Sequence, residues 1–157
     1  MMFTYKLVRL IETHADRLTE SLLEQVRTSP DLPAYHLIRQ DEVEDRVSDI
    51  YRHLGNWLLS NNEQDIAVRY TEIGVRRAQQ KVPLSQVIKV IVLTKETLWQ
   101  HLQKEALLDR PVEVFGELEL LQMLERFFDR AIYHAAVGHE SVASAQTIQP
   151  VVESVAK

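Results

Sequence analysis

The six histidines are the side chains of this sequence best suited to hold a metal ion or a haem iron. They are His14, His36, His53, His101, His134 and His139. A carboxylate metal site in a four-helix bundle draws Glu-x-x-His motifs from two of its helices. Three positions before the last four histidines stand Ile50, Leu98, Ala131 and Ala136, so this motif is missing. We therefore predict no metal site.

Three of these histidines have informative neighbours. Asp45, Asp49 and His53 are spaced four apart and share one face of a helix, where we interpret Asp49 and His53 as a solvated i,i+4 pair. His14 falls on an apolar helical stripe, and we expect it to be half-buried with a backbone or carboxylate partner. His101, in an apolar helix, is the least unfavourable axial ligand for a haem.

A second candidate site is a group of basic residues near the end of one predicted helix, namely Arg69, Arg76, Arg77 and Lys81. Such a group can bind an anion or a phosphate. It can also interact favourably with the negative end of the helix dipole. We favour the dipole interpretation, because these residues do not converge on a helix N-terminus, where anions usually bind.

The motifs of the common catalytic sites are missing. There is no cysteine, no Gly-x-Ser-x-Gly elbow and no His-Glu-x-x-His pair. The four glycines are too scattered to form a phosphate-binding loop. Glu117 and Glu119 are two apart and point to different faces of a helix. We therefore predict no catalytic residues and no enzymatic activity.

Composition points to a globular protein of the cytoplasm. The chain has 157 residues, 45% of them hydrophobic and 26% charged, which suits one domain with a real core. Its formal net charge of −5 argues against nucleic acid as a partner. Charges at Lys6, Arg9, Glu12 and Asp16 interrupt any signal peptide, and no apolar run is long enough to span a membrane.

Apolar residues recur at helical spacing in five segments. We expect these helices over residues 3–28, 41–60, 63–81, 83–108 and 111–145. The apolar run at 87–93 also fits a buried strand, but helical spacing continues through Leu98, Trp99 and Leu102, which favours a helix. The predicted fold is an all-α, single-domain bundle of about five helices, and a globin-like arrangement with steeper crossing angles stays open.

The domain boundary and the core follow from the same pattern. Residues 1–145 form the predicted helical sensory or interaction domain, and residues 146–157 form a tail or the start of a linker. Seven aromatic side chains could line a pocket, but we interpret them more simply as core. They are Trp57, Tyr70, Trp99, Phe115, Phe127, Phe128 and Tyr133.

One stretch is similar to a known family. In residues 70–87 a helix ends in Gly74-x-x-Arg77, a short polar turn follows, and Pro83-Leu84 opens an apolar helix. This pattern resembles the N-terminal domain of RsbR/RsbRD-type co-antagonists of bacterial stress and phosphorelay signalling. The segments 57–59 and 10–14 fit as well, and the resemblance covers residues 5–135.

The resemblance implies a sensory or scaffolding input domain that dimerises. In that family such a domain is usually followed by a STAS domain or a kinase, and related domains resemble globins without haem. The sequence ends soon after the helical region, so we expect either a stand-alone version of the domain or a piece of a longer protein. The resemblance transfers no ligand-binding residues.

The predicted function is therefore a non-catalytic bacterial signalling domain, without a cofactor. We expect a homodimer that works with a STAS, kinase or phosphatase partner. The alternative is a cofactor-binding helical protein, either a haem globin or a metal-carboxylate bundle. His53, His101 and His134 are the residues that this alternative would use.

Overall fold

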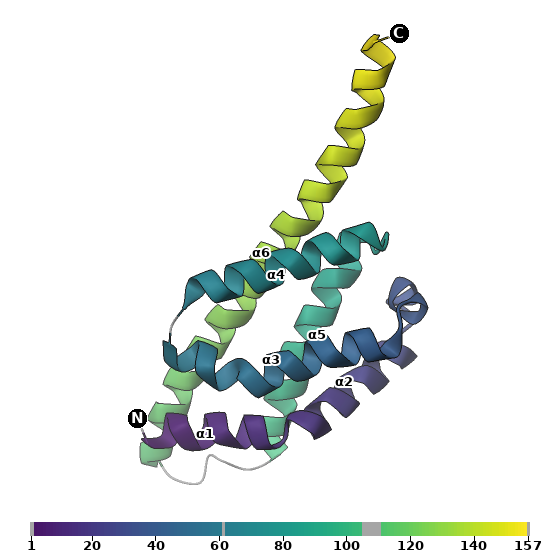
Figure 1. The fold of residues 1–157 in the computed structure, drawn as a ribbon. Coiled ribbons are helices and arrows are strands. Elements are labelled where there is room, and N and C mark those ends of the chain that lie inside the picture. Colours follow the sequence, from purple (N-terminus) through teal and green to yellow (C-terminus); the bar gives the residue numbers. More distant parts are fainter. Residues whose placement is uncertain (1, 61, 105–110, 157) are drawn as a thin grey trace.

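The structure is a computed structural model that describes the backbone of residues 2–60, 62–104 and 111–156. Side chains are described for residues 8–52, 54, 57, 62–104, 121–142, 144 and 145. The helices are α1 (Met2–Thr13), α2 (Ala15–Thr28), the 3₁₀ helix η1 (Pro33–Leu37), α3 (Gln40–Ser60), α4 (Glu63–Gln79), α5 (Leu84–Lys104) and α6 (Pro111–Ala156). The described backbone contains no strand, so the predicted all-α single domain is confirmed (Figure 1). Residues 87–93 lie in α5 and are helical, as predicted.

The helix predicted over residues 3–28 is two helices, because it bends at His14. This residue has φ −96° and ψ 13°, outside the α-helical range. Its N–H still donates to the Leu10 carbonyl over 3.0 Å, and its own carbonyl accepts from the Leu18 N–H over 3.0 Å. His14 therefore closes the last turn of α1 and opens the first turn of α2.

The turn between α4 and α5 ends α4 two residues earlier than predicted. Lys81 adopts a φ of 63°, a left-handed conformation that glycine usually supplies. The Val82 N–H then donates back to the Arg77 carbonyl over 3.0 Å, which closes a Schellman motif. At the other end of α4, Asn62 caps the helix, since its side chain accepts from the Gln64 N–H over 3.2 Å.

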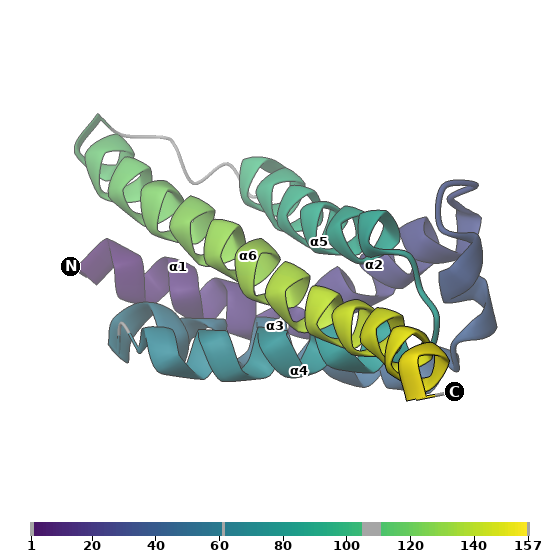
Figure 2. The same cartoon turned by 90° about the horizontal axis from the view of Figure 1, so that it is seen from above.

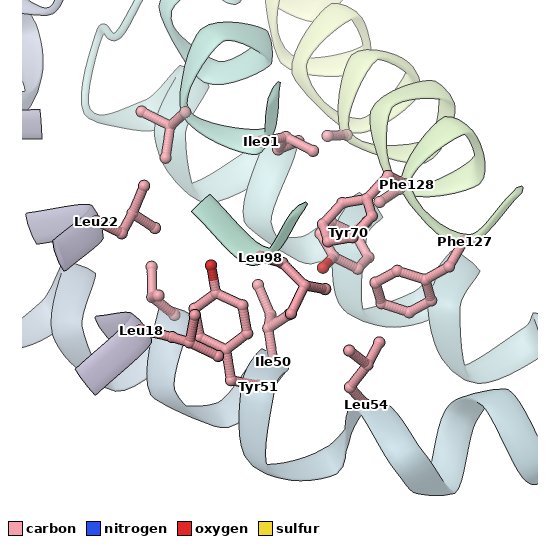
Figure 3. Close-up of a cluster of buried hydrophobic side chains, with 14 of the residues drawn as sticks. Leu18, Leu22, Ile50, Tyr51, Leu54, Tyr70, Ile91, Leu98, Phe127 and Phe128 are labelled. Atoms are coloured by element: carbon pink, nitrogen blue, oxygen red, sulfur yellow. The ribbon is translucent and has the colours of Figure 1, made fainter. Parts of the chain in front are cut away.

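The apolar stripes converge on one core (Figure 3). The Tyr51 hydroxyl donates to the Thr94 carbonyl over 2.8 Å and so joins α3 to α5 inside this core. Buried aromatic side chains, as predicted, are Trp57, Tyr70, Phe127 and Phe128. Trp99 is half-buried. For Tyr133 the prediction was wrong, because this side chain is 64% exposed. Phe115 lies outside the described side chains.

Helices α4 and α6 approach each other backbone to backbone. A Cβ atom on Gly74 would lie 2.1 Å from the Ala135 carbonyl oxygen, and one on Gly138 would lie 2.2 Å from the Thr71 carbonyl oxygen. Neither position has room for a side chain. Glycine is therefore needed at both places, although it is a poor helix former.

Helix α6 continues past the other helices. Its C-terminal part projects away from the bundle (Figure 1). Residues 146–156 thus extend the helix predicted to reach residue 145, and their role as a tail or linker start stays a prediction. None of the described helices has the length and apolar character needed to cross a membrane.

The Gly138→Ala variant tests the contact between α4 and α6. Alanine is the better helix former by about 1 kcal/mol. We nevertheless expect the free energy of unfolding to fall by about 2 kcal/mol, because the new methyl group forces two backbones apart. Urea denaturation measures this change. The exposed Glu140→Ala variant, less than one turn further on α6, is the control and should stay within about 0.5 kcal/mol of the parent. A stabilised Gly138→Ala protein would contradict the contact.

Candidate functional site

Two members of the basic group, Arg76 and Arg77, contact α3 through the carboxylate of Glu42. The Arg76 Nε donates to Glu42 Oε1 over 3.0 Å, and the Arg77 Nη1 donates to the same oxygen over 3.1 Å. The Gln80 side-chain amide donates to both Glu42 oxygens, over 3.3 and 3.1 Å. Two side chains from the last turn of α4 and that of its C-cap residue Gln80 therefore hold one glutamate at the start of α3.

Arg77 is the buried member of this cluster, with a residue exposure of only 3%. Besides Glu42, it donates to Gln80 Oε1 over 2.8 Å, and its guanidinium lies over the Tyr35 ring at 5.6 Å from the centroid. Burying a charge is costly unless it is paired and hydrogen-bonded. Its Nε has no hydrogen-bond partner among the described residues, so even here the compensation is incomplete.

The hydrogen bond from Arg76 is the main cause that lowers the pKa of Glu42, and burial opposes this effect. Arg77 and Gln80 lower the pKa further. Glu42 thus stays ionised in the folded protein at any pH near neutral.

The other two residues of the basic group have separate positions. Arg69 forms an ion pair with Asp49 of α3, and its guanidinium lies over the Trp57 ring at 5.0 Å. Lys81 is exposed in the turn after α4. The three arginines therefore serve as links between α3 and α4. Neither the anion-site nor the helix-dipole interpretation had anticipated these partners.

Two histidines meet at the bend between α1 and α2. The His14 Nδ1 and the His101 Nε2 are 3.0 Å apart, with ring centroids separated by 4.8 Å in an edge-on arrangement. One ring must donate and the other accept, so at least one of them is neutral. His14 is half-buried as predicted, but the expected backbone or carboxylate partner was wrong, because its partner is His101.

The remaining histidines do not gather into a cofactor site. His36 and His139 bond backbone carbonyls, those of Val26 at 3.0 Å and of Val82 at 2.6 Å. The His134 ring lies against the neighbouring Tyr133 ring. Trp99 bonds Glu125, and His134 lies more than two helical turns beyond Glu125 on α6, so the structure does not bring His101 and His134 together.

His53, the third residue of the cofactor alternative, lies outside the described side chains, so its interpretation as a solvated partner of Asp49 stays a prediction. Asp49 itself is half-buried and paired with Arg69. Among the described residues, no three side chains of the metal-binding types cluster together.

A crevice of about 580 Å³ opens beside His101, between α2 and α5. This volume falls in the range of small-molecule sites. Its lining residues are Arg17, Leu18, Ser21, Thr97, Gln100, His101, Gln103 and Lys104. Two other cavities among the described residues are much smaller, at about 150 and 40 Å³.

Comparison with known protein families decides the assignment. Residues 13–148 match the family described as the RsbT co-antagonist protein rsbRD N-terminal domain. The chain belongs to this family. The suspected resemblance is thereby confirmed, and it covers the whole described part of the crevice and the Glu42 cluster. Neither the comparison with curated proteins nor that with solved structures found a match.

Two buried tyrosine hydroxyls of this RsbRD N-terminal domain are unsuited to acid–base chemistry. Burial is the main cause that raises the pKa of Tyr51 and of Tyr70 far above the ordinary value of a phenol. Both groups therefore stay protonated under all physiological conditions. The Tyr70 hydroxyl also lacks a hydrogen-bond partner within the described part of the chain.

The crevice of the RsbRD N-terminal domain was not predicted from the sequence. One signal was present in the polar residues Thr97, Gln100, His101 and Lys104, which recur at steps of three and one within α5. That spacing places four polar side chains on one face. Arg17, Ser21 and Gln25 likewise recur at steps of four on α2, but the distance between the two helices along the chain conceals their proximity.

Replacement of Glu42 tests whether its carboxylate stabilises the buried charge of Arg77. We expect the Glu42→Gln variant to lose about 2 kcal/mol of folding free energy at pH 7, because Arg77 becomes a buried and unpaired charge. Since folding lowers the pKa of Glu42, this stabilisation is full above the unfolded-state pKa of about 4.3 and is lost as the pH falls through the lower folded-state value.

Denaturation series at several pH values measure this dependence. The difference between the parent and the variant should shrink below about pH 4. Glu44→Gln, an exposed carboxylate on the same helix, is the matched control and should change little. A difference between parent and Glu42→Gln that does not depend on pH would contradict the ionic role of Glu42.

Proposed function

We propose that this RsbRD N-terminal domain is a non-catalytic input module of bacterial signalling, which works in the cytoplasm as a homodimer. Membership of the family carries the proposal. The contacts made by the candidate arginines and histidines of the sequence analysis support the proposal. The arginines of α4 bind α3, and His36 and His139 bind backbone carbonyls, so these groups stabilise the fold.

The dimer surface that we propose lies on α6. Tyr133 and Val137 are one helical turn apart, and their exposed fractions are 64% and 43%. They form a continuous apolar strip on a helix that also extends past the bundle (Figure 1). Pairing with the same strip of a second copy would remove this surface from water in a two-fold symmetric interface.

The double variant Tyr133→Glu/Val137→Glu tests this surface. We expect light scattering to give a dimer for the parent chain and a monomer for the variant, because two like charges would face their symmetry mates in an apolar interface. Val68→Glu, an exposed apolar site on α4, is the control and should remain dimeric. A parent chain that is monomeric at high concentration would contradict the dimer.

A downstream partner distinguishes a signalling module from an inert helical domain. We expect the chain to bind a STAS-domain protein, a kinase or a phosphatase that is encoded beside it, with a Kd of about 1–100 µM. Isothermal titration calorimetry with each purified neighbour measures this affinity. If a folded chain binds none of them, the proposed signalling role is wrong.

A further inference from the structure

Helices α2 and α5 are neighbours in the bundle (Figure 2), and the crevice opens between them. A polar contact spans the two helices at each end. His14 meets His101 at 3.0 Å, and the Gln25 amide donates to the Thr97 hydroxyl over 3.0 Å. Leu18, which is fully buried, forms part of its lining between these contacts. These two contacts therefore hold the walls at a fixed separation. Binding of a ligand then requires little free energy to order the walls.

The charge of the crevice is one-sided. Arg17 on α2 and Lys104 on α5 both line it, and none of its described lining residues is acidic. Neither cation forms an ion pair within the described part of the chain. This is unusual here, because the chain carries a net charge of −5 and most of its other arginines have carboxylate partners.

The helix dipole accounts for only one of these two cations. Lys104 lies in the last turn of α5, where a positive charge is favourable. Arg17 lies in the first turn of α2, at the positive end of that helix, where a cation is unfavourable. The neighbouring Asp16 does not compensate it, because Asp16 pairs with Arg52 of α3. The dipole of α2 therefore does not account for the position of Arg17.

Neutral hydrogen-bonding groups complete the site. The Ser21 hydroxyl and the amides of Gln100 and Gln103 line the same crevice. Among the described residues, neither glutamine side chain is engaged in a hydrogen bond. Amide and hydroxyl groups beside a guanidinium and an ammonium form a typical set for an anion that also carries hydroxyl or carbonyl oxygens.

We propose that this crevice binds a small organic anion, a metabolite with carboxylate or phosphate groups, through Arg17 and Lys104. Ser21, Gln100 and Gln103 orient it, and Leu18 contacts its carbon skeleton. The ligand class deepens the proposed input function and rests on it for its biological meaning. The binding event itself is independent of the dimer strip on α6 and of any partner protein.

Two-dimensional ¹H–¹⁵N NMR spectra of the full chain test the proposal, with succinate and inorganic phosphate as probes at constant ionic strength. We expect saturable shift changes at the amides of Arg17, Ser21, Gln100 and Lys104 below about 10 mM of one of the two anions. The anion that saturates first identifies the preferred group, carboxylate or phosphate. Glycerol, a neutral polyol of similar size, should cause no saturable change.

Two double variants with the same net charge decide whether the site is specific. Arg17→Gln/Lys104→Gln should weaken binding by roughly tenfold or more. Arg46→Gln/Lys89→Gln removes two exposed cations outside the crevice and should leave the Kd within about twofold. The spectra also report that each variant is folded.

The proposal is wrong if neither anion causes saturable changes in the parent chain, or if both double variants weaken binding equally. Such a result would leave the dimer of α6 and the binding of a partner protein untouched, because those are measured without the anions. Conversely, a monomeric chain without any protein partner could still bind the anion, which would separate the ligand site from the signalling role.

Discussion

The contact between the backbones of α4 and α6 is the constraint on which the other contacts depend. Gly74 and Gly138 remove the side chains that would keep the two helices apart. One turn before Gly74, Tyr70 can then reach the Phe127 ring, at 6.0 Å between centroids. Less than one turn after it, Arg77 is turned toward α3. The position of α4 on α6 thus fixes which α4 residues face the core and which face the rest of the bundle.

The position of α4 has an unfavourable consequence, which is the burial of the Arg77 side chain. Its charge is removed from water, and Glu42, Gln80 and the Tyr35 ring must together replace its hydration. A buried ion pair is often no more stabilising than an apolar cluster of the same volume. It is more selective, however, because Glu42 of α3, Gln80 after α4 and Tyr35 of η1 must all be in place around Arg77. The cluster therefore contributes to a unique geometry more than to stability.

Helical periodicity predicted most of the fold, since it depends only on residues near each other along the chain. The bend at His14 was missed because no glycine or proline marks it in residues 3–28. The extension of α6 through residues 146–156 was missed because small polar residues resemble a loop. The crevice needs tertiary structure, since Arg17 and Lys104 belong to helices that are distant in sequence.

A short segment of α5 joins the crevice to α6. Thr97 accepts from Gln25 of α2 over 3.0 Å. On the other side of the same segment, Lys95 and Trp99 donate to the Glu125 carboxylate of α6, over 3.2 and 3.1 Å. A ligand that moved α5 would therefore have to carry α6 along or break the bonds to Glu125. Since a ligand shifts an equilibrium only by its difference in affinity for two states, the crevice can act on α6 only through a ligand that binds better to one position of α5 than to another.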